Sequence, residues 1–90
     1  MFEDLNKKEI ELLKLYIKFE KDRNIESKID KFDVNGEMTD SLIEKGYLNG
    51  VQRKGAKGDI VSDFNYGLTG YLISDKTIES FNLRKEYPQK

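Results

Sequence analysis

The chain has 90 residues, a net charge of −1, and equal shares of hydrophobic and charged residues at 37% each. A chain of this length and composition forms one small domain, so residues 1–90 are treated as a single folding unit. The sequence contains neither cysteine nor histidine, which excludes disulfides, thiolate or imidazole metal ligands, and catalysis by either residue.

The first predicted element is an amphipathic helix that begins after Asn6. Asn6 and Glu9 have the spacing of a capping box, in which each side chain accepts a hydrogen bond from the other residue's backbone N–H. Leu5 and Ile10 occupy the positions of a hydrophobic staple. Hydrophobic side chains then recur at helical spacing on one broad face: Ile10, Leu12, Leu13, Tyr16, Ile17 and Phe19. We expect this helix to end between residues 21 and 24.

Two shorter helices are predicted next. Spacings of four and three residues separate Ile25, Ile29 and Phe32, which predicts a helix over residues 26–33. The tripeptide "VNG" at residues 34–36 is typical of a turn. A third helix is predicted over residues 37–45, with an inward face formed by Met38, Leu42 and Ile43.

Gly46 marks the end of the third predicted helix. A glycine just beyond a helix readily adopts the left-handed conformation that ends it. Tyr47 is then placed to pack on Leu42, as in a Schellman motif. The segment around Gly46 is therefore predicted to be a structural helix end.

The second half of the chain has the pattern of a hairpin with flanking strands. We predict a strand at residues 47–51 ("YLNGV"), a hairpin tip at 52–59 ("QRKGAKGD"), and a third strand at 67–73 ("GLTGYLI"). Residues 60–64 ("IVSDF") fit either a second strand or part of a long wing. The candidates for burial in the first strand are Tyr47, Leu48 and Val51.

A final helix is predicted after Ser74, which is a good N-cap residue. Ile78 and Phe81 lie three residues apart on one face of this helix. Pro88 cannot continue a helix, so we expect residues 84–90 to form a frayed tail and the ordered core to span about residues 5–83.

The predicted order is three helices, a strand, a hairpin, a strand and a last helix. "LIEKGYLNGV" at residues 42–51 resembles the end of the third helix and the first wing strand of winged-helix domains. "YLISDKTIESF" at residues 71–81 resembles their apolar–Thr–Glu–Lys–Gly motif, with Ser74, Asp75 and Lys76 at the first three polar positions and Thr77 in place of the glycine. We expect an α+β winged helix, with a three-helix core, a two- or three-stranded β-wing and a C-terminal helix.

Among winged-helix groups, the chain most resembles the small YjcQ-like proteins of bacteria and their phages. The shared features are the "GYLNGV"-like segment, the chain length and the late "ISDKTIESF"-like helix, and the resemblance spans roughly residues 8–82. It implies a winged-helix fold and no established activity. The wider class implies binding of double-stranded DNA, as in a regulator of the phage or mobile-element type, which is an inference from fold analogy.

Eight residues are candidates for contact with DNA. The main group is the basic wing of Arg53, Lys54 and Lys57, whose charges suit phosphates and whose neighbouring glycines allow close approach. Basic residues with glycines are also ordinary for a soluble hairpin tip. The other five candidates are Lys28 and Lys31 on the second helix and Thr39, Ser41 and Lys45 on the third. Because the net charge is near zero, DNA binding of this kind requires a homodimer or a partner.

A second hypothesis is a protein–protein interaction module that keeps the winged-helix fold and does not bind DNA. The third helix carries Glu37, Asp40 and Glu44, offset by Lys45 alone. A recognition helix lies beside the phosphate rows of the major groove, where carboxylates are repelled.

Other functions are not supported by the sequence. A calcium loop around Gly36 lacks the first ligand and the bidentate carboxylate, because Lys31 and Leu42 occupy those positions. A phosphate-binding loop at residues 50–57 lacks the required Gly-Lys-Ser/Thr ending. We therefore predict no enzyme, metal site or cofactor. The chain has neither a signal-peptide pattern nor a membrane-spanning hydrophobic stretch, so we expect a cytoplasmic protein.

Overall fold

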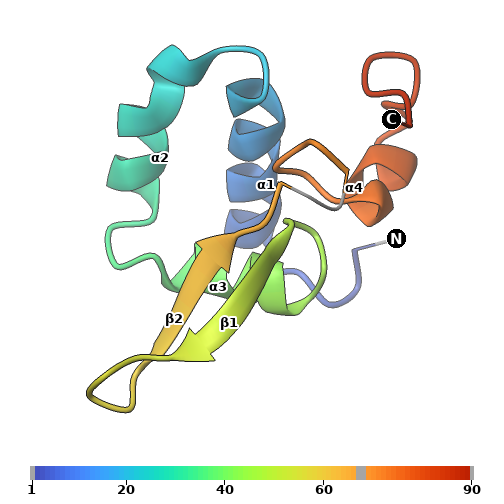
Figure 1. Ribbon diagram of the computed structural model, residues 1–90. Helices are drawn as coiled ribbons and strands as arrows, with labels where there is room; N and C mark the ends of the chain where they lie inside the picture. The colour runs from blue at the N-terminus through green and yellow to red at the C-terminus, as the bar shows by residue number, and fades with distance from the viewer. Residues whose placement is uncertain (1, 67–68, 90) are drawn as a thin grey trace.

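The computed structural model describes residues 2–66 and 69–89, and in these residues the chain is an α+β protein (Figure 1). Four α-helices and one two-stranded antiparallel sheet are present in this part of the chain. The elements in order are α1 (Lys7–Phe19), a 3₁₀ turn η1 (Arg23–Ile25), α2 (Glu26–Phe32), α3 (Glu37–Glu44), β1 (Gly50–Lys54), β2 (Ile60–Phe64) and α4 (Asp75–Ser80). No helix in the described ranges is long and apolar enough to cross a membrane.

Helix α1 begins at the predicted capping box. The Asn6 side chain accepts from the Glu9 N–H at 2.8 Å, and the Glu9 carboxylate accepts from the Asn6 N–H at 3.0 Å. The helix ends at Phe19, earlier than predicted, because Asp22 starts a new turn by accepting from the N–H of Asn24 at 3.1 Å. Local capping therefore determines both the start of α1 and the start of the next turn.

The predicted boundaries of α2 and α3 agree with the structure to within one residue. Gly46 adopts a φ of +85°, and the N–H of Tyr47 donates to the Leu42 carbonyl at 2.9 Å. The N–H of Gly46 donates to the Ile43 carbonyl at 3.1 Å, which completes the two hydrogen bonds of a Schellman motif. The predicted helix end is thus confirmed.

Strands β1 and β2 form a hairpin that projects away from the helices (Figure 1). Val51 pairs with Asp63 and Lys54 with Ile60, so β2 is confirmed as a true strand. Tyr47 and Leu48 are buried as predicted, but they precede the hairpin. The prediction that Val51 is buried is wrong: its side chain is 50% exposed, because a two-stranded hairpin outside the helical layer has no core to face.

The predicted third strand does not form in residues 69–73, and Gly67 and Leu68 lie outside the described residues. A single bridge joins Leu48 to Ile73, flanked by hydrogen bonds from the Asn49 N–H to the Leu72 carbonyl at 2.8 Å and from the Ser74 N–H to the Tyr47 carbonyl at 3.1 Å. The N–H groups of Leu72 and Ile73 instead donate to the carboxylate of Glu20 at the end of α1. The backbone groups of this buried segment are thus satisfied in part by residues 47–49 and in part by the Glu20 side chain.

Ser74 is the N-cap of helix α4 as predicted, and its hydroxyl accepts from the Thr77 N–H at 3.3 Å. The structure differs from the expected frayed tail, because Tyr87 is buried in the core and its ring meets Tyr71 edge-on at 5.1 Å. Arg84 forms ion pairs with carboxylates of α4. The tail therefore packs back on the domain through the buried ring of Tyr87 and the ion pairs of Arg84.

Candidate functional site

Two of the predicted DNA contacts on α3 hydrogen-bond to other parts of the protein. The Thr39 hydroxyl donates to the Asp33 carboxylate at 2.7 Å and lies 2.8 Å from the Tyr16 hydroxyl. The Ser41 hydroxyl donates to the Glu9 carboxylate at 2.6 Å. Both side chains are half-buried, so these hydroxyls join α3 to α1 and to the preceding turn.

Lys45 is held by the same network. Its ammonium group lies 3.2 Å from the Glu9 carboxylate and donates to the Asp4 carbonyl at 2.6 Å. Burial acts to raise the pKa of Glu9, but hydrogen bonds from Ser41, the Asn6 backbone and Lys45 outweigh it, so the pKa lies below its usual value. Lys45 therefore neutralises a buried carboxylate and is not a free surface cation.

The basic wing is less basic than its sequence suggests. Arg53 forms an ion pair with Asp63 at 2.7 Å, because the hairpin register places the two residues diagonally on one face. Asp59 adds a second carboxylate near the tip. Lys54 and Lys57 are exposed and take part in none of the ion pairs found in the described residues. The hairpin thus offers two unpaired cations.

Lys28 and Lys31 lie on the exposed face of α2. Within residues 2–66 and 69–89, α2 makes no contact with either strand of the hairpin. Figure 1 shows the hairpin pointing away from α2. The structure therefore does not bring the predicted basic residues together into one continuous surface.

The exposed face of α3 is acidic. Glu37, Asp40 and Glu44 follow one another at helical spacing, and we call them the acidic stripe. Glu37 and Glu44 are exposed, and Asp40 is half-buried. These carboxylates are not joined to the hairpin lysines by any ion pair found in the described residues.

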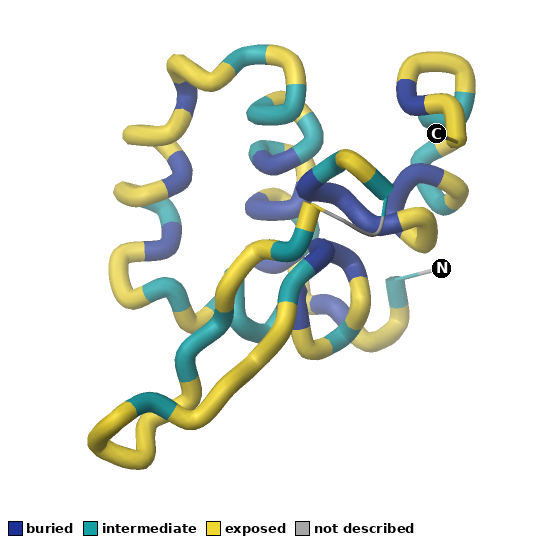
Figure 2. The backbone as a smooth tube through the Cα atoms, in the orientation of Figure 1, coloured by how far each residue is buried: buried dark blue, intermediate teal, exposed yellow. Residues whose placement is uncertain are grey.

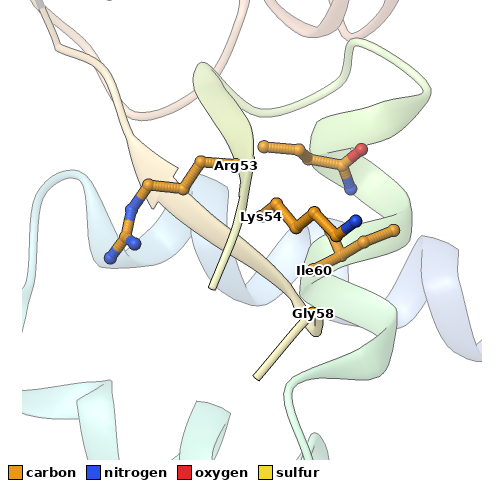
Figure 3. Close-up of a pocket in the computed structure, with 5 residues that line it drawn as sticks. Arg53, Lys54, Gly58 and Ile60 are labelled. Carbon is orange, nitrogen blue, oxygen red and sulfur yellow. The ribbon is translucent and has the colours of Figure 1, made fainter. Parts of the chain in front are cut away.

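The hairpin also exposes large hydrophobic residues. Figure 2 shows that most residues of the hairpin are exposed, whereas the centre of the domain is buried. Ile60 is 66% exposed and lines an open pocket with Gln52, Arg53, Lys54 and Gly58. In Figure 3 the side chains of Lys54 and Ile60 point to the same side of the hairpin, whereas Arg53 points to the other. Sequence reasoning missed this surface, although a two-stranded hairpin cannot bury either face by itself.

The base of the hairpin is fixed to the helices. Phe64 packs against Tyr16 with ring centroids 6.0 Å apart. A Cβ atom at Gly50 would lie only 3.0 Å from the Ile43 side chain, so the strand passes very close to α3. The base is therefore held firmly, and the residues at the tip are presented to solvent.

Comparisons of the chain with protein-family models, with curated proteins and with solved structures find no match. Among the described residues, no group of three or more acidic side chains is placed to hold a metal ion.

Proposed function

We propose that the chain is a small winged-helix protein of the YjcQ-like kind that acts by binding another protein through its hairpin. The order of α1, α2, α3 and the β1–β2 hairpin supports the winged-helix assignment. The observation that carries the function is the exposure of Ile60 at 66% on a projecting hairpin. Ile60 lines an open pocket together with Gln52, Arg53 and Lys54, and a hydrophobic hollow with a polar rim is typical of protein-interaction sites.

The negative charge of α3 and the hydrogen bonds of its hydroxyl groups favour a protein partner over duplex DNA. Carboxylates of the acidic stripe would face phosphates in any docking that places α3 in the major groove. Thr39 and Ser41, the hydroxyls suited to base or phosphate contacts, already hydrogen-bond within the protein. Such a helix suits a protein surface that carries basic residues.

A photocrosslinking experiment tests this proposal. A photoreactive amino acid is placed at position 60 and, as a control, at the exposed position 14 on α1. We expect an ultraviolet-dependent protein adduct in cells from position 60 and none from position 14. An adduct that disappears on nuclease treatment, or no adduct at position 60, would contradict the proposal.

A second candidate function is binding of duplex DNA by the wing, which the two unpaired lysines favour. Lys54 and Lys57 are the predicted phosphate contacts that remain exposed on the hairpin without an acidic partner in the described residues. With two such contacts, the logarithm of affinity should fall with the logarithm of salt concentration at a slope of about −2. Fluorescence anisotropy with labelled duplex DNA at two salt concentrations measures this slope. Binding that is unchanged in Lys54→Ala with Lys57→Ala would rule out the wing as the contact.

A further inference from the structure

Two hydrophobic side chains are more exposed than any other large hydrophobic residue in the described ranges. Val34 is 80% exposed and Ile60 is 66% exposed. Val34 lies in the turn between α2 and α3, and Ile60 begins strand β2. Burying either side chain in an interface would contribute roughly 25 cal/mol per Å² of hydrophobic surface removed from water.

The charged residues beside these two side chains are mainly of opposite sign, although the exposed Asp59 directly precedes Ile60. Val34 precedes Glu37, the first member of the acidic stripe, by three residues. Ile60 lies directly across the hairpin from Lys54, and Lys57 lies between these two residues in the hairpin tip. One surface therefore combines a hydrophobic residue with carboxylates, and the other combines a hydrophobic residue with ammonium groups.

Within one molecule the two surfaces meet at one hydrogen bond, from the Gln52 side-chain amide to the Asp40 carbonyl at 3.4 Å, and not through their charges. The described residues contain no ion pair between the hairpin lysines and the acidic stripe. The hairpin base is fixed against α1 and α3 by Phe64 and Gly50. Figure 1 shows the tip projecting beyond the helices. The charges of both surfaces therefore remain available to a partner from outside the molecule.

We propose that the partner is a second copy of this chain, and that the hairpin surface of each protomer docks on the Val34 and acidic-stripe surface of the other. A molecule that carries two complementary surfaces can form a closed dimer about a two-fold axis, in which both contacts are made twice. Ile60 then meets Val34 of the other protomer, and Lys54 and Lys57 meet the acidic stripe. Opposite charges across the interface fix this orientation and disfavour the alternatives. The inference rests on the proposed function, because it names the protein partner of the same hairpin.

The test is sedimentation equilibrium of the purified chain and of two charge-reversed variants. The first variant carries Lys54→Glu with Lys57→Glu, and the second carries Glu37→Lys with Glu44→Lys. A control variant, Lys14→Glu with Lys85→Glu, changes the same amount of charge at exposed sites on α1 and in the tail. Circular dichroism establishes that each variant keeps the helical content of the parent chain.

We expect the parent chain and the control to approach twice the 10.5 kDa monomer mass as concentration rises. Each charge-reversed variant should dimerise at least tenfold more weakly, and an equimolar mixture of the two should recover dimerisation, because each acidic surface then meets a basic one. High salt should weaken the parent dimer, since part of the attraction is between exposed charges. Rescue in the mixture is specific to reciprocal docking.

A parent chain that stays monomeric at every concentration, or a mixture that stays monomeric, would overturn the inference. If a variant does not fold, photocrosslinking from position 60 in the purified parent chain provides the second measurement. An adduct of twice the monomer mass that maps to residues 34–44 supports reciprocal docking, and an adduct elsewhere or none overturns it. If position 60 crosslinks in cells only to a different protein, the dimer fails and the proposed function stands. The absence of any protein adduct, in cells and in the purified chain, would contradict both the dimer and the proposed function.

Discussion

Glu9 is the residue through which α1, α3 and the N-terminal segment are joined, and replacing it with glutamine tests the network directly. The Glu9 side chain is 7% exposed and Lys45 is 31% exposed, so their ion pair lies between the surface and buried cases. Surface pairs contribute about 0–1 kcal/mol and loss of one partner of a buried pair costs about 3–5 kcal/mol. Glutamine keeps an acceptor for the Asn6 N–H and loses the charge. We therefore expect Glu9→Gln to lower the free energy of unfolding by about 2 kcal/mol near neutral pH.

This loss should depend on pH in a defined direction. The pKa of Glu9 in the folded protein lies below its usual value. The charge-dependent stabilisation is therefore complete above the usual value and is lost as pH falls through the folded value. The difference between the parent and Glu9→Gln should shrink toward acid pH, where the parent carboxyl is also uncharged.

Urea unfolding followed by circular dichroism measures both effects. With a slope of about 1 kcal/mol per molar urea for a domain this small, the midpoint should fall by about 2 M near neutral pH. Glu11→Gln, at an exposed position of the same helix, is the matched control and should change the midpoint little. An equal loss at neutral and acid pH would refute the assigned role of the charge, and no loss at all would refute the network.

Three further substitutions test other parts of the fold. Asn49→Ala should lower the free energy of unfolding by about 2 kcal/mol, because the buried Asn49 amide donates to the carbonyls of Tyr71 at 3.0 Å and Ile73 at 3.1 Å; a loss under about 0.5 kcal/mol in urea unfolding would contradict this. Gly50→Ala should cost about 1–3 kcal/mol, since its Cβ would lie 2.7 Å from the Asp63 carbonyl oxygen; an unchanged melting temperature would show that the strands separate easily. Tyr87→Ala should lower the free energy of unfolding by about 3 kcal/mol, because the Tyr87 side chain is buried in the core. A change near zero in thermal unfolding would show that the tail is frayed.

The parts of the fold that were predictable are those determined by neighbours in sequence. The Asn6–Glu9 box and the Gly46 helix end each depend on residues within one or two turns, so their signals are present in the local sequence. The burial of Tyr87 depends on contact with Tyr71, sixteen residues away, and nothing near Pro88 indicates it. The prediction of a third strand was wrong for the same reason, because the N–H groups of Leu72 and Ile73 bond to the distant Glu20 side chain and the segment keeps only one bridge to Leu48.

The candidate site shows the same division. The exposure of Lys54 and Lys57 follows from their place at a hairpin tip. The ion pair between Arg53 and Asp63 depends on strand register, which the residue pattern of a hairpin exposed on both faces does not specify. The hydrogen bond from Ser41 to Glu9 joins residues 32 positions apart, so only the folded structure could reveal it.

The pairing of Glu20 with the backbone of Leu72 and Ile73 also has a consequence for how the protein assembles. These hydrogen bonds join positions 52 and 53 residues apart, so they form only after α1 and the later half of the chain have come together. The amide protons of Leu72 and Ile73 should therefore exchange with solvent at a rate set by the separation of these two parts. In a hydrogen-exchange measurement, these two amides report the cooperative opening of the molecule, whereas those of the hairpin tip report only local fraying.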